Sequence, residues 1–243
     1  MIPPRGFVGV SIYSSETRTD MSRLILLALT STMLLSFGHQ ARRKVLFFGD
    51  SITQAGVNPG GYIRLIDSIM KAEGVADRYE TIGAGIGGNK IYDLFLRMDA
   101  DVLAKKPDIC IVYIGVNDVW HKTSSGTGTD YDKFGRFYEA VVAKLRNAGI
   151  RVILATPAVI GERTDHSNAQ DGDLNLYSNW IRNYATAQKL PLVDLRRIFL
   201  DYNLRNNPKN DEKGILTSDR VHLNAKGNLV VAQAMWQAIR GLD

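Results

Sequence analysis

Three short segments contain residue types that together can carry out acyl transfer. Ser51 follows the apolar run 45–48, and a serine hydroxyl becomes a useful nucleophile when a base lies within hydrogen-bond reach. Asp219 precedes His222 by three residues, a spacing at which a carboxylate can orient an imidazole so that its other nitrogen faces a serine. We therefore predict Ser51 as nucleophile, His222 as general base and Asp219 as the group that orients it.

Acyl transfer also needs donors for the negative oxygen that forms during the reaction, each worth roughly 3–4 kcal/mol of barrier. We predict an oxyanion hole formed by the backbone N–H groups of Ser51 and Gly88 and by the side-chain amide of Asn117. Asn117 taken alone fits a structural turn equally well. Trp120 and His121 follow shortly after Asn117 and are candidates for the wall of a substrate pocket. Packing against the neighbouring loop explains Trp120 equally well.

Other chemistries fit the sequence less well. The segment 83–88 satisfies the G-x-G-x-x-G pattern of dinucleotide sites, but it follows the second predicted strand, and the next strand lacks the expected acidic residue. Cys110 lies inside an apolar strand and is expected to be an inert core thiol. The sequence has no Walker A pattern and no histidine cluster with metal-ligand spacing. We therefore predict a site without a metal or a cofactor.

Short apolar runs alternate with helix-periodic segments from residue 44 onward, which predicts a parallel sheet with helices on both faces. The predicted strands span residues 45–48, 79–82, 109–114, 152–155 and 192–194. The predicted helices span residues 62–71, 91–104 with an interruption near Met98, 131–148, 173–188 capped by Asp173, and 224–241. Because ligands bind at the carboxyl ends of parallel strands, we expect Ser51, Gly88 and Asn117 to gather at one edge.

The N-terminal region has a different character. We interpret 1–20 as an unstructured extension upstream of the true start, Met21, and 21–41 as a secretory signal with one arginine, an apolar stretch and small residues. Residues 42–243 then form one hydrolase domain. An uncleaved anchor or an N-terminal core helix remains an alternative for 21–41. We expect a secreted or periplasmic protein with no stable membrane insertion after processing.

The formal charge of +5 over 243 residues is small and diffuse. The single short basic run, 42–44, is too small for a nucleic-acid face, so we predict no nucleic-acid partner. The sequence gives no indication of oligomeric state.

These segments resemble the four blocks of the SGNH (GDSL) hydrolase superfamily, in order, over about residues 44–241. The blocks are Gly49-Asp50-Ser51, Gly85-Ile86-Gly87-Gly88-Asn89, Gly115-Val116-Asn117-Asp118 and Asp219 to His222. The resemblance implies a flavodoxin-like, three-layer α/β/α sandwich with a five-stranded parallel sheet, and metal-free ester hydrolysis. One departure is Gly83, where the second block usually has a polar residue.

The expected function is that of a serine esterase. The segment 161–172 is polar and long for a strand-to-helix connection, which favours a hydrated substrate. We therefore expect removal of O-acetyl groups from small esters or acetylated carbohydrate. The alternatives are a lysophospholipase or thioesterase of the same superfamily, a carbohydrate-binding module without turnover, and a nucleotide-binding protein.

Overall fold

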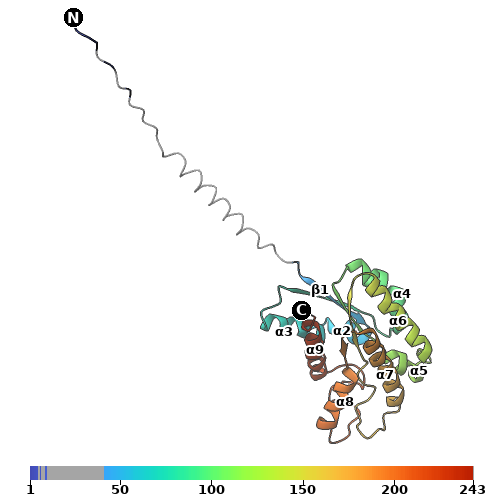
Figure 1. Cartoon of the computed structure of the whole chain (residues 1–243). Coiled ribbons are helices and arrows are strands. Elements are labelled where there is room, and N and C mark those ends of the chain that lie inside the picture. Colours follow the sequence, from blue (N-terminus) through green and yellow to red (C-terminus); the bar gives the residue numbers. More distant parts are fainter. Residues whose placement is uncertain (5, 7–8, 10–40, 243) are drawn as a thin grey trace. The chain divides into compact units, whose positions relative to one another are not determined.

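The computed structural model describes residues 1–4, 6, 9 and 41–242 (Figure 1). The chain divides into the units Met1–Ala41 and Arg42–Asp243. Apart from Ala41, the proposed signal segment 21–41 lies outside the described residues, and the proposed extension 1–20 is described only in part. Both assignments therefore stay predictions.

The second unit is built on a five-stranded sheet in which every neighbouring pair is parallel. Its strands are β1 (Arg43–Gly49), β2 (Tyr79–Gly85), β3 (Ile109–Tyr113), β4 (Arg151–Ala155) and β5 (Leu192–Val193), in the order β2-β1-β3-β4-β5. All five residues of β3 are buried, because the central strand is covered on both faces. The predicted α/β class and five-stranded parallel sheet are confirmed.

Helices cover both faces of this sheet. They are α2 (Ser51–Gly56), α3 (Tyr62–Ala72), α4 (Ile91–Asp101), the 3₁₀ turn η1 (Leu103–Lys105), α5 (Val116–Ser124), α6 (Tyr131–Asn147), α7 (Asp171–Gln188), α8 (Leu195–Asn206) and α9 (Ala225–Arg240). Helices α3 and α9 lie together on one side, and α4, α6 and α7 lie on the other (Figure 1). Parallel strands need such right-handed helical crossovers, and the strand order places them on opposite faces.

The strand register brings three segments to one edge of the sheet. Gly49, the last residue of β1, lies opposite Gly85 of β2 on one side and Tyr113 of β3 on the other. The turn that carries Ser51, the loop that carries Gly88 and the start of α5 therefore begin at the same level. The expected gathering of the candidate residues follows from this register.

Strand β2 continues to Gly85, three residues beyond its predicted end. These three residues pair with β1, and α2 packs closely against this end of the strand. A Cβ atom at Gly85 would overlap the backbone of Thr53 and Gln54, so only glycine lets this helix lie against the strand. The requirement for glycine at this position of the G-x-G-x-x-G pattern therefore comes from local packing.

Other boundaries also differ from the prediction. Helix α7 begins at Asp171, so Asp173 does not cap it, and the Asp171 carboxylate instead pairs with Arg196 at 2.7 Å. Helix α4 runs without interruption through Met98 and ends at Asp101. Helices α2, α5 and α8 were not predicted from the sequence. Two of these are short, with six and nine residues, and such elements leave a weak periodic signal.

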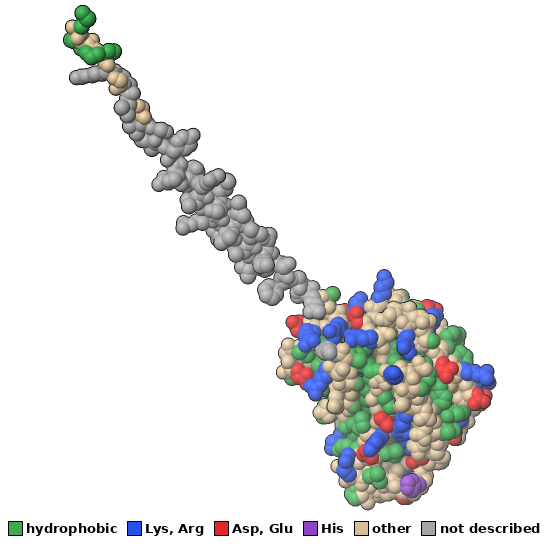
Figure 2. Space-filling model, viewed as in Figure 1, with side chains coloured by type: hydrophobic (Ala, Val, Ile, Leu, Met, Phe, Trp, Pro, Cys, Tyr) green, Lys and Arg blue, Asp and Glu red, His purple; other side chains and the backbone are tan. Residues whose placement is uncertain are grey.

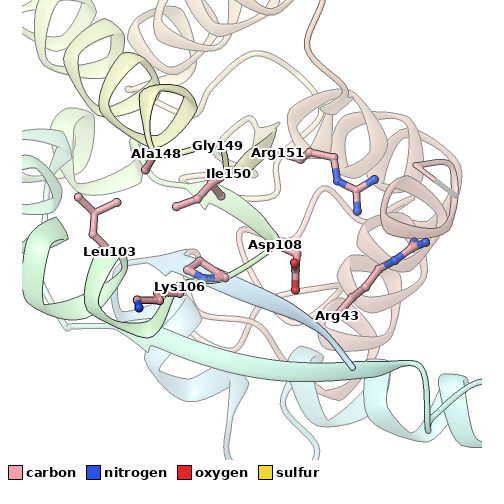
Figure 3. A pocket seen from close by; sticks show the side chains of 9 residues that line it. Arg43, Leu103, Lys106, Asp108, Ala148, Gly149, Ile150 and Arg151 are labelled. Carbon is pink, nitrogen blue, oxygen red and sulfur yellow. The ribbon is translucent and has the colours of Figure 1, made fainter. Parts of the chain in front are cut away.

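The opposite edge of the sheet, where the strands begin, contains a pocket of about 610 Å³ (Figure 3). Arg43, Lys106, Arg151 and Asp108 supply its charged lining. The residues that line it include no serine, histidine or cysteine, so this pocket cannot hold the predicted serine–histidine chemistry. The candidate chemistry therefore lies at the other edge.

The visible surface carries both basic and acidic side chains over the same face (Figure 2). Within the part of the chain that the structure describes, no helix is both long enough and apolar enough to cross a membrane.

Candidate active site

The candidate nucleophile Ser51 is the first residue of α2, directly beyond β1. Asp50 is the N-cap of this helix, and its Oδ1 accepts a hydrogen bond from the Ile52 N–H at 3.0 Å. The cap fixes the turn in which the serine lies. Asp50 therefore braces the loop that presents the serine.

Ser51, His222 and Asp219 form one continuous hydrogen-bonded chain. Ser51 Oγ lies 2.9 Å from His222 Nε2, and His222 Nδ1 lies 2.7 Å from Asp219 Oδ2. In this arrangement the carboxylate selects the imidazole tautomer whose Nε2 accepts a proton from serine. The geometry is that of an activated nucleophile for acyl transfer.

A tight loop before α9 positions the histidine and the carboxylate. Thr217 and Leu223 form an isolated antiparallel bridge, and the segment between them contains Asp219 and His222. The N–H groups of Val221 and His222 donate to Asp219 Oδ1 at 3.1 and 2.8 Å. Asp219 is therefore fixed to the backbone as well as to the imidazole.

The pKa of Asp219 is lowered, which keeps this carboxylate ionised. Partial burial acts to raise the pKa, but hydrogen bonds from the His222 backbone, the His222 ring and the Val221 N–H outweigh it. An ionised carboxylate in contact with an imidazole stabilises the protonated form of that ring.

The predicted oxyanion donors lie around the loop between β2 and α4. Gly88 has a φ of +77°, a left-handed conformation that favours glycine. Asn117 is buried on α5, and its Nδ2 donates to the Asn89 carbonyl at 3.1 Å. The structure thus brings Asn117 against the Gly88–Asn89 segment, although it belongs to a helix and not to a strand edge.

Trp120 and His121 lie on α5 beside the catalytic candidates. The Trp120 ring meets the His222 ring edge-on, with the two ring centroids 6.1 Å apart. The His121 ring, on the same helix as Trp120, has its centroid 5.6 Å from that of Trp120. Trp120 also packs against the hydrophobic core. Burial, followed by the charge of Lys90, lowers the pKa of His121, which keeps the ring neutral near neutral pH.

Asp118 and His121 repeat the Asp-x-x-His spacing of the catalytic candidates. Their environments differ, because Asp118 is fully buried and accepts the Ile91 N–H at 3.2 and 3.3 Å. This carboxylate fastens α5 to the first turn of α4. The spacing alone therefore does not tell which of the two Asp–His pairs belongs to the candidate site, whereas the contacts of each carboxylate in the folded chain do.

Two buried carboxylates lie beneath the site. Burial raises the pKa of Asp50 to about 7, with the Ile52 hydrogen bond opposing the shift, the Asp118 charge adding to it and the His222 charge lowering it. Burial likewise raises the pKa of Asp118 to about 6. The protonation of Asp50 is therefore electrostatically coupled to that of the histidine.

Glu162 is a buried residue that was not among the predicted site residues. It is the second residue of the polar segment 161–172, and its carboxylate accepts hydrogen bonds from the N–H groups of Ile215, Leu216 and Thr217 at 2.8, 2.6 and 2.9 Å. These three residues lead into the loop that carries Asp219 and His222. The sequence shows an acidic residue soon after a buried strand, which could have marked Glu162 as a site candidate. Its role could not be inferred from the sequence, because its backbone partners lie more than 50 positions away.

Cys110 is fully buried in β3, and burial raises the pKa of its thiol. Its interpretation as core packing is confirmed.

A family model for the GDSL-like lipase/acylhydrolase family matches residues 47–230. The chain belongs to this family. As a family member it is a carboxylic ester hydrolase, which confirms the expected enzyme class over a non-catalytic module or a nucleotide-binding protein.

Several known proteins are similar to this chain over most of its length. The crystal structure of an acetyl xylan esterase, AlAXEase, has 62% sequence identity and a TM-score of 0.80, covering 81% of this chain and 99% of that one. An acetylxylan esterase from Geobacillus stearothermophilus is 28% identical over 214 residues, which is 81% of this chain and 93% of the relative. An uncharacterised lipoprotein, YqeF, from Bacillus subtilis (strain 168) is 25% identical over 176 residues, 64% of this chain and 72% of the relative.

Proposed function

We propose that this family member is a serine esterase that removes O-acetyl groups from carbohydrate. The observation that carries the proposal is the hydrogen-bonded chain from Ser51 Oγ through His222 to Asp219. The proposed substrate rests on the similarity to two acetylxylan esterases, one with 62% identity.

The reaction begins with attack of Ser51 Oγ on the ester carbonyl carbon while His222 Nε2 takes the hydroxyl proton. Ser51 N–H, Gly88 N–H and Asn117 Nδ2 hold the resulting oxyanion. The intermediate collapses to an acetyl-serine, the bond between the acyl carbon and the sugar oxygen breaks, and His222 gives its proton to that departing oxygen, which leaves as a hydroxyl group. Water activated by His222 then releases acetate and restores the serine.

We assign the substrate contacts to side chains that lie next to the proposed catalytic residues. Trp120 beside His222 offers an aromatic face to the substrate, and His121, kept neutral, offers a hydrogen-bonding group. The polar segment 161–172 borders the catalytic loop, because the Gly161 N–H donates to the Arg220 carbonyl at 2.9 Å. A polar border of this kind suits a hydrated carbohydrate better than a long acyl chain.

We also propose that the enzyme acts outside the cytoplasm, in the periplasm or the medium. The signal-like pattern of 21–41 and the similarity to a protein named as a lipoprotein support this. Recovery of active enzyme from the medium or periplasm, with cleavage after Gly38 or Ala41, would bear this out. Retention of an intact N-terminus in the cytoplasm would refute it.

The test of the reaction compares the purified protein with Ser51→Ala on p-nitrophenyl acetate, butyrate and octanoate, and on acetylated xylo-oligosaccharide. Acetate release that disappears in the variant, with little turnover of octanoate, is the expected result. A preference for octanoate would overturn the carbohydrate assignment in favour of a lysophospholipase or thioesterase.

A further inference from the structure

Arg97 on α4 has no part in the proposed chemical steps, yet it reaches three segments of the site. Its Nε donates to Asn89 Oδ1 at 2.6 Å. Its Nη2 donates to the Gly49 carbonyl at 2.7 Å and to the Ala84 carbonyl at 3.0 Å. One guanidinium therefore joins the ends of β1 and β2 to the loop between β2 and α4.

The environment of Arg97 holds its guanidinium in place. Nη1 pairs with Asp101 at 2.6 Å, one helical turn further along α4, and the side chain is only 14% exposed. The guanidinium carbon lies 4.6 Å from the centre of the Phe48 ring. The ion pair, the aromatic contact and the partial burial restrict the motion of the side chain.

Two of the residues that accept hydrogen bonds from Arg97 lie close in sequence to the proposed nucleophile and to a proposed oxyanion donor. Gly49 lies two residues before Ser51, and Asn89 follows Gly88 directly. The Asn89 carbonyl also accepts Asn117 Nδ2 at 3.1 Å. The residues that carry the nucleophile and the oxyanion donors are thus connected through Arg97 and Asn89.

This connection requires an arginine. Its planar guanidinium directs several N–H groups along fixed directions, whereas lysine offers one nitrogen on a flexible chain. Lysine at this position would retain a positive charge beside Asp101 but could not bond Gly49, Ala84 and Asn89 at once. Charge-assisted hydrogen bonds to backbone carbonyls are also stronger than neutral ones.

We propose that Arg97 is a positioning residue that fixes the spacing between Ser51 and the oxyanion donors. This inference rests on the proposed function in that it takes Ser51 as the nucleophile. Loss of the guanidinium lets the oxyanion loop move relative to the serine, which weakens transition-state contacts more than substrate binding. The effect therefore appears in kcat and leaves KM nearly unchanged.

The experiment compares Arg97→Gln and Arg97→Lys with a matched control, Arg182→Gln. Arg182 makes a comparable fork to Asp194 at the β5 edge, with both N–O distances at 2.8 Å, and its side chain is 29% exposed. We expect kcat on p-nitrophenyl acetate to fall about 10- to 100-fold in Arg97→Gln, with KM within about twofold. We expect an intermediate loss in Arg97→Lys and a kcat close to that of the wild type in Arg182→Gln.

A double variant separates positioning from general destabilisation. If Arg97 acts through the oxyanion loop, the kcat losses of Arg97→Gln and Asn117→Ala combine to less than their product. A wild-type kcat in Arg97→Gln, or losses that multiply fully, would overturn the proposal. If Arg97→Gln does not fold, Arg97→Lys decides, and a folded lysine variant with wild-type kcat would overturn it.

A second readout keeps this inference separate from the choice of substrate. A fluorophosphonate reacts when the serine oxygen bonds to phosphorus and fluoride leaves, so its labelling rate depends on Ser51 and the oxyanion donors but on no acetyl group. Slower labelling in Arg97→Gln than in Arg182→Gln supports the inference, and equal rates oppose it. Wild-type protein that labels but does not hydrolyse acetate would overturn only the acetyl specificity.

Discussion

Ser51 and His222 are separated by 171 positions in the chain, yet Ser51 Oγ lies 2.9 Å from His222 Nε2. The parallel sheet places the serine at the end of β1, and the loop before α9 returns the histidine to the same edge. The Asp219 carboxylate, which contacts His222 Nδ1, comes from the same loop, so one tight backbone segment carries both the proposed base and its partner.

This relationship predicts how the three side chains act together. Ser51→Ala and His222→Ala should each lower kcat by at least about 10³-fold, and the double variant should lose little more, because the two groups work as a unit. Asp219→Asn should give a large but smaller loss. Steady-state kinetics measure these effects, with Asp99→Asn as an exposed control. Additive losses in the double variant would contradict a shared role.

The buried amide of Asn117 makes a different prediction. Asn117→Asp keeps the shape of the side chain but removes the donor, so kcat should fall about 10²- to 10³-fold while KM changes little. Kinetics on p-nitrophenyl acetate, with circular dichroism to verify folding, measure this. A change confined to KM would point to ground-state binding of substrate instead.

Asp50 should make stability depend on pH. Its folded pKa of about 7 exceeds the ordinary value of 3.8, so the folded state keeps a proton that the unfolded state loses. Stability from this group is therefore present below pH 4 and is lost as the pH rises towards 7, by at most about 4 kcal/mol.

Asp50→Asn removes that titration and keeps an oxygen that can accept the Ile52 N–H. Urea unfolding of both proteins between pH 4 and 8 should show the variant gaining stability relative to the wild type as the pH rises. A constant difference between the two would show that Asp50 titrates alike in both states.

Glu162 should stabilise the loop that carries Asp219 and His222 through its hydrogen bonds to the backbone just before that loop. Glu162→Gln leaves one acceptor oxygen for three backbone N–H groups, which should lower the free energy of unfolding by about 1–3 kcal/mol. It should also lower kcat, because Thr217 pairs with Leu223 across the loop that holds His222. The exposed residue Glu139 provides the control variant Glu139→Gln. Normal kcat with reduced stability would limit Glu162 to the fold.

Lys90 should affect His121 through its charge. Lys90 is buried, its Nζ donates to the Gly88 carbonyl at 3.3 Å, and its charge adds to burial in lowering the pKa of His121. Lys90→Gln should therefore raise the pKa of His121 towards, but not up to, its ordinary value, because burial remains. NMR titration of the histidine ring measures this, with Lys144→Gln as a control. An unchanged pKa would show that the two side chains are screened from each other.

The sequence predicts the sheet well because its signals are local. Buried strands leave continuous apolar runs, and the amphipathic helices leave a 3.6-residue period, so β1, β3, β4, α3, α6 and α9 lie within a few residues of their predicted limits. Helix α2 was missed because its start depends on the Asp50 cap and on close packing against Gly85. These causes involve single contacts that no periodicity records.

The order of residues alone establishes the alternation of strands and helices, the succession of the site segments and the residue types able to perform acyl transfer. Which polar residues meet depends on tertiary packing. Packing joins Arg97 to Gly49 across 48 positions and Glu162 to Ile215 across 53. It also gives two Asp-x-x-His pairs of identical spacing different contacts, since Asp118 binds the Ile91 backbone whereas Asp219 binds the His222 ring. Periodicity and spacing report neighbours along the chain, whereas the partner of a long polar side chain is set by the packing of distant elements.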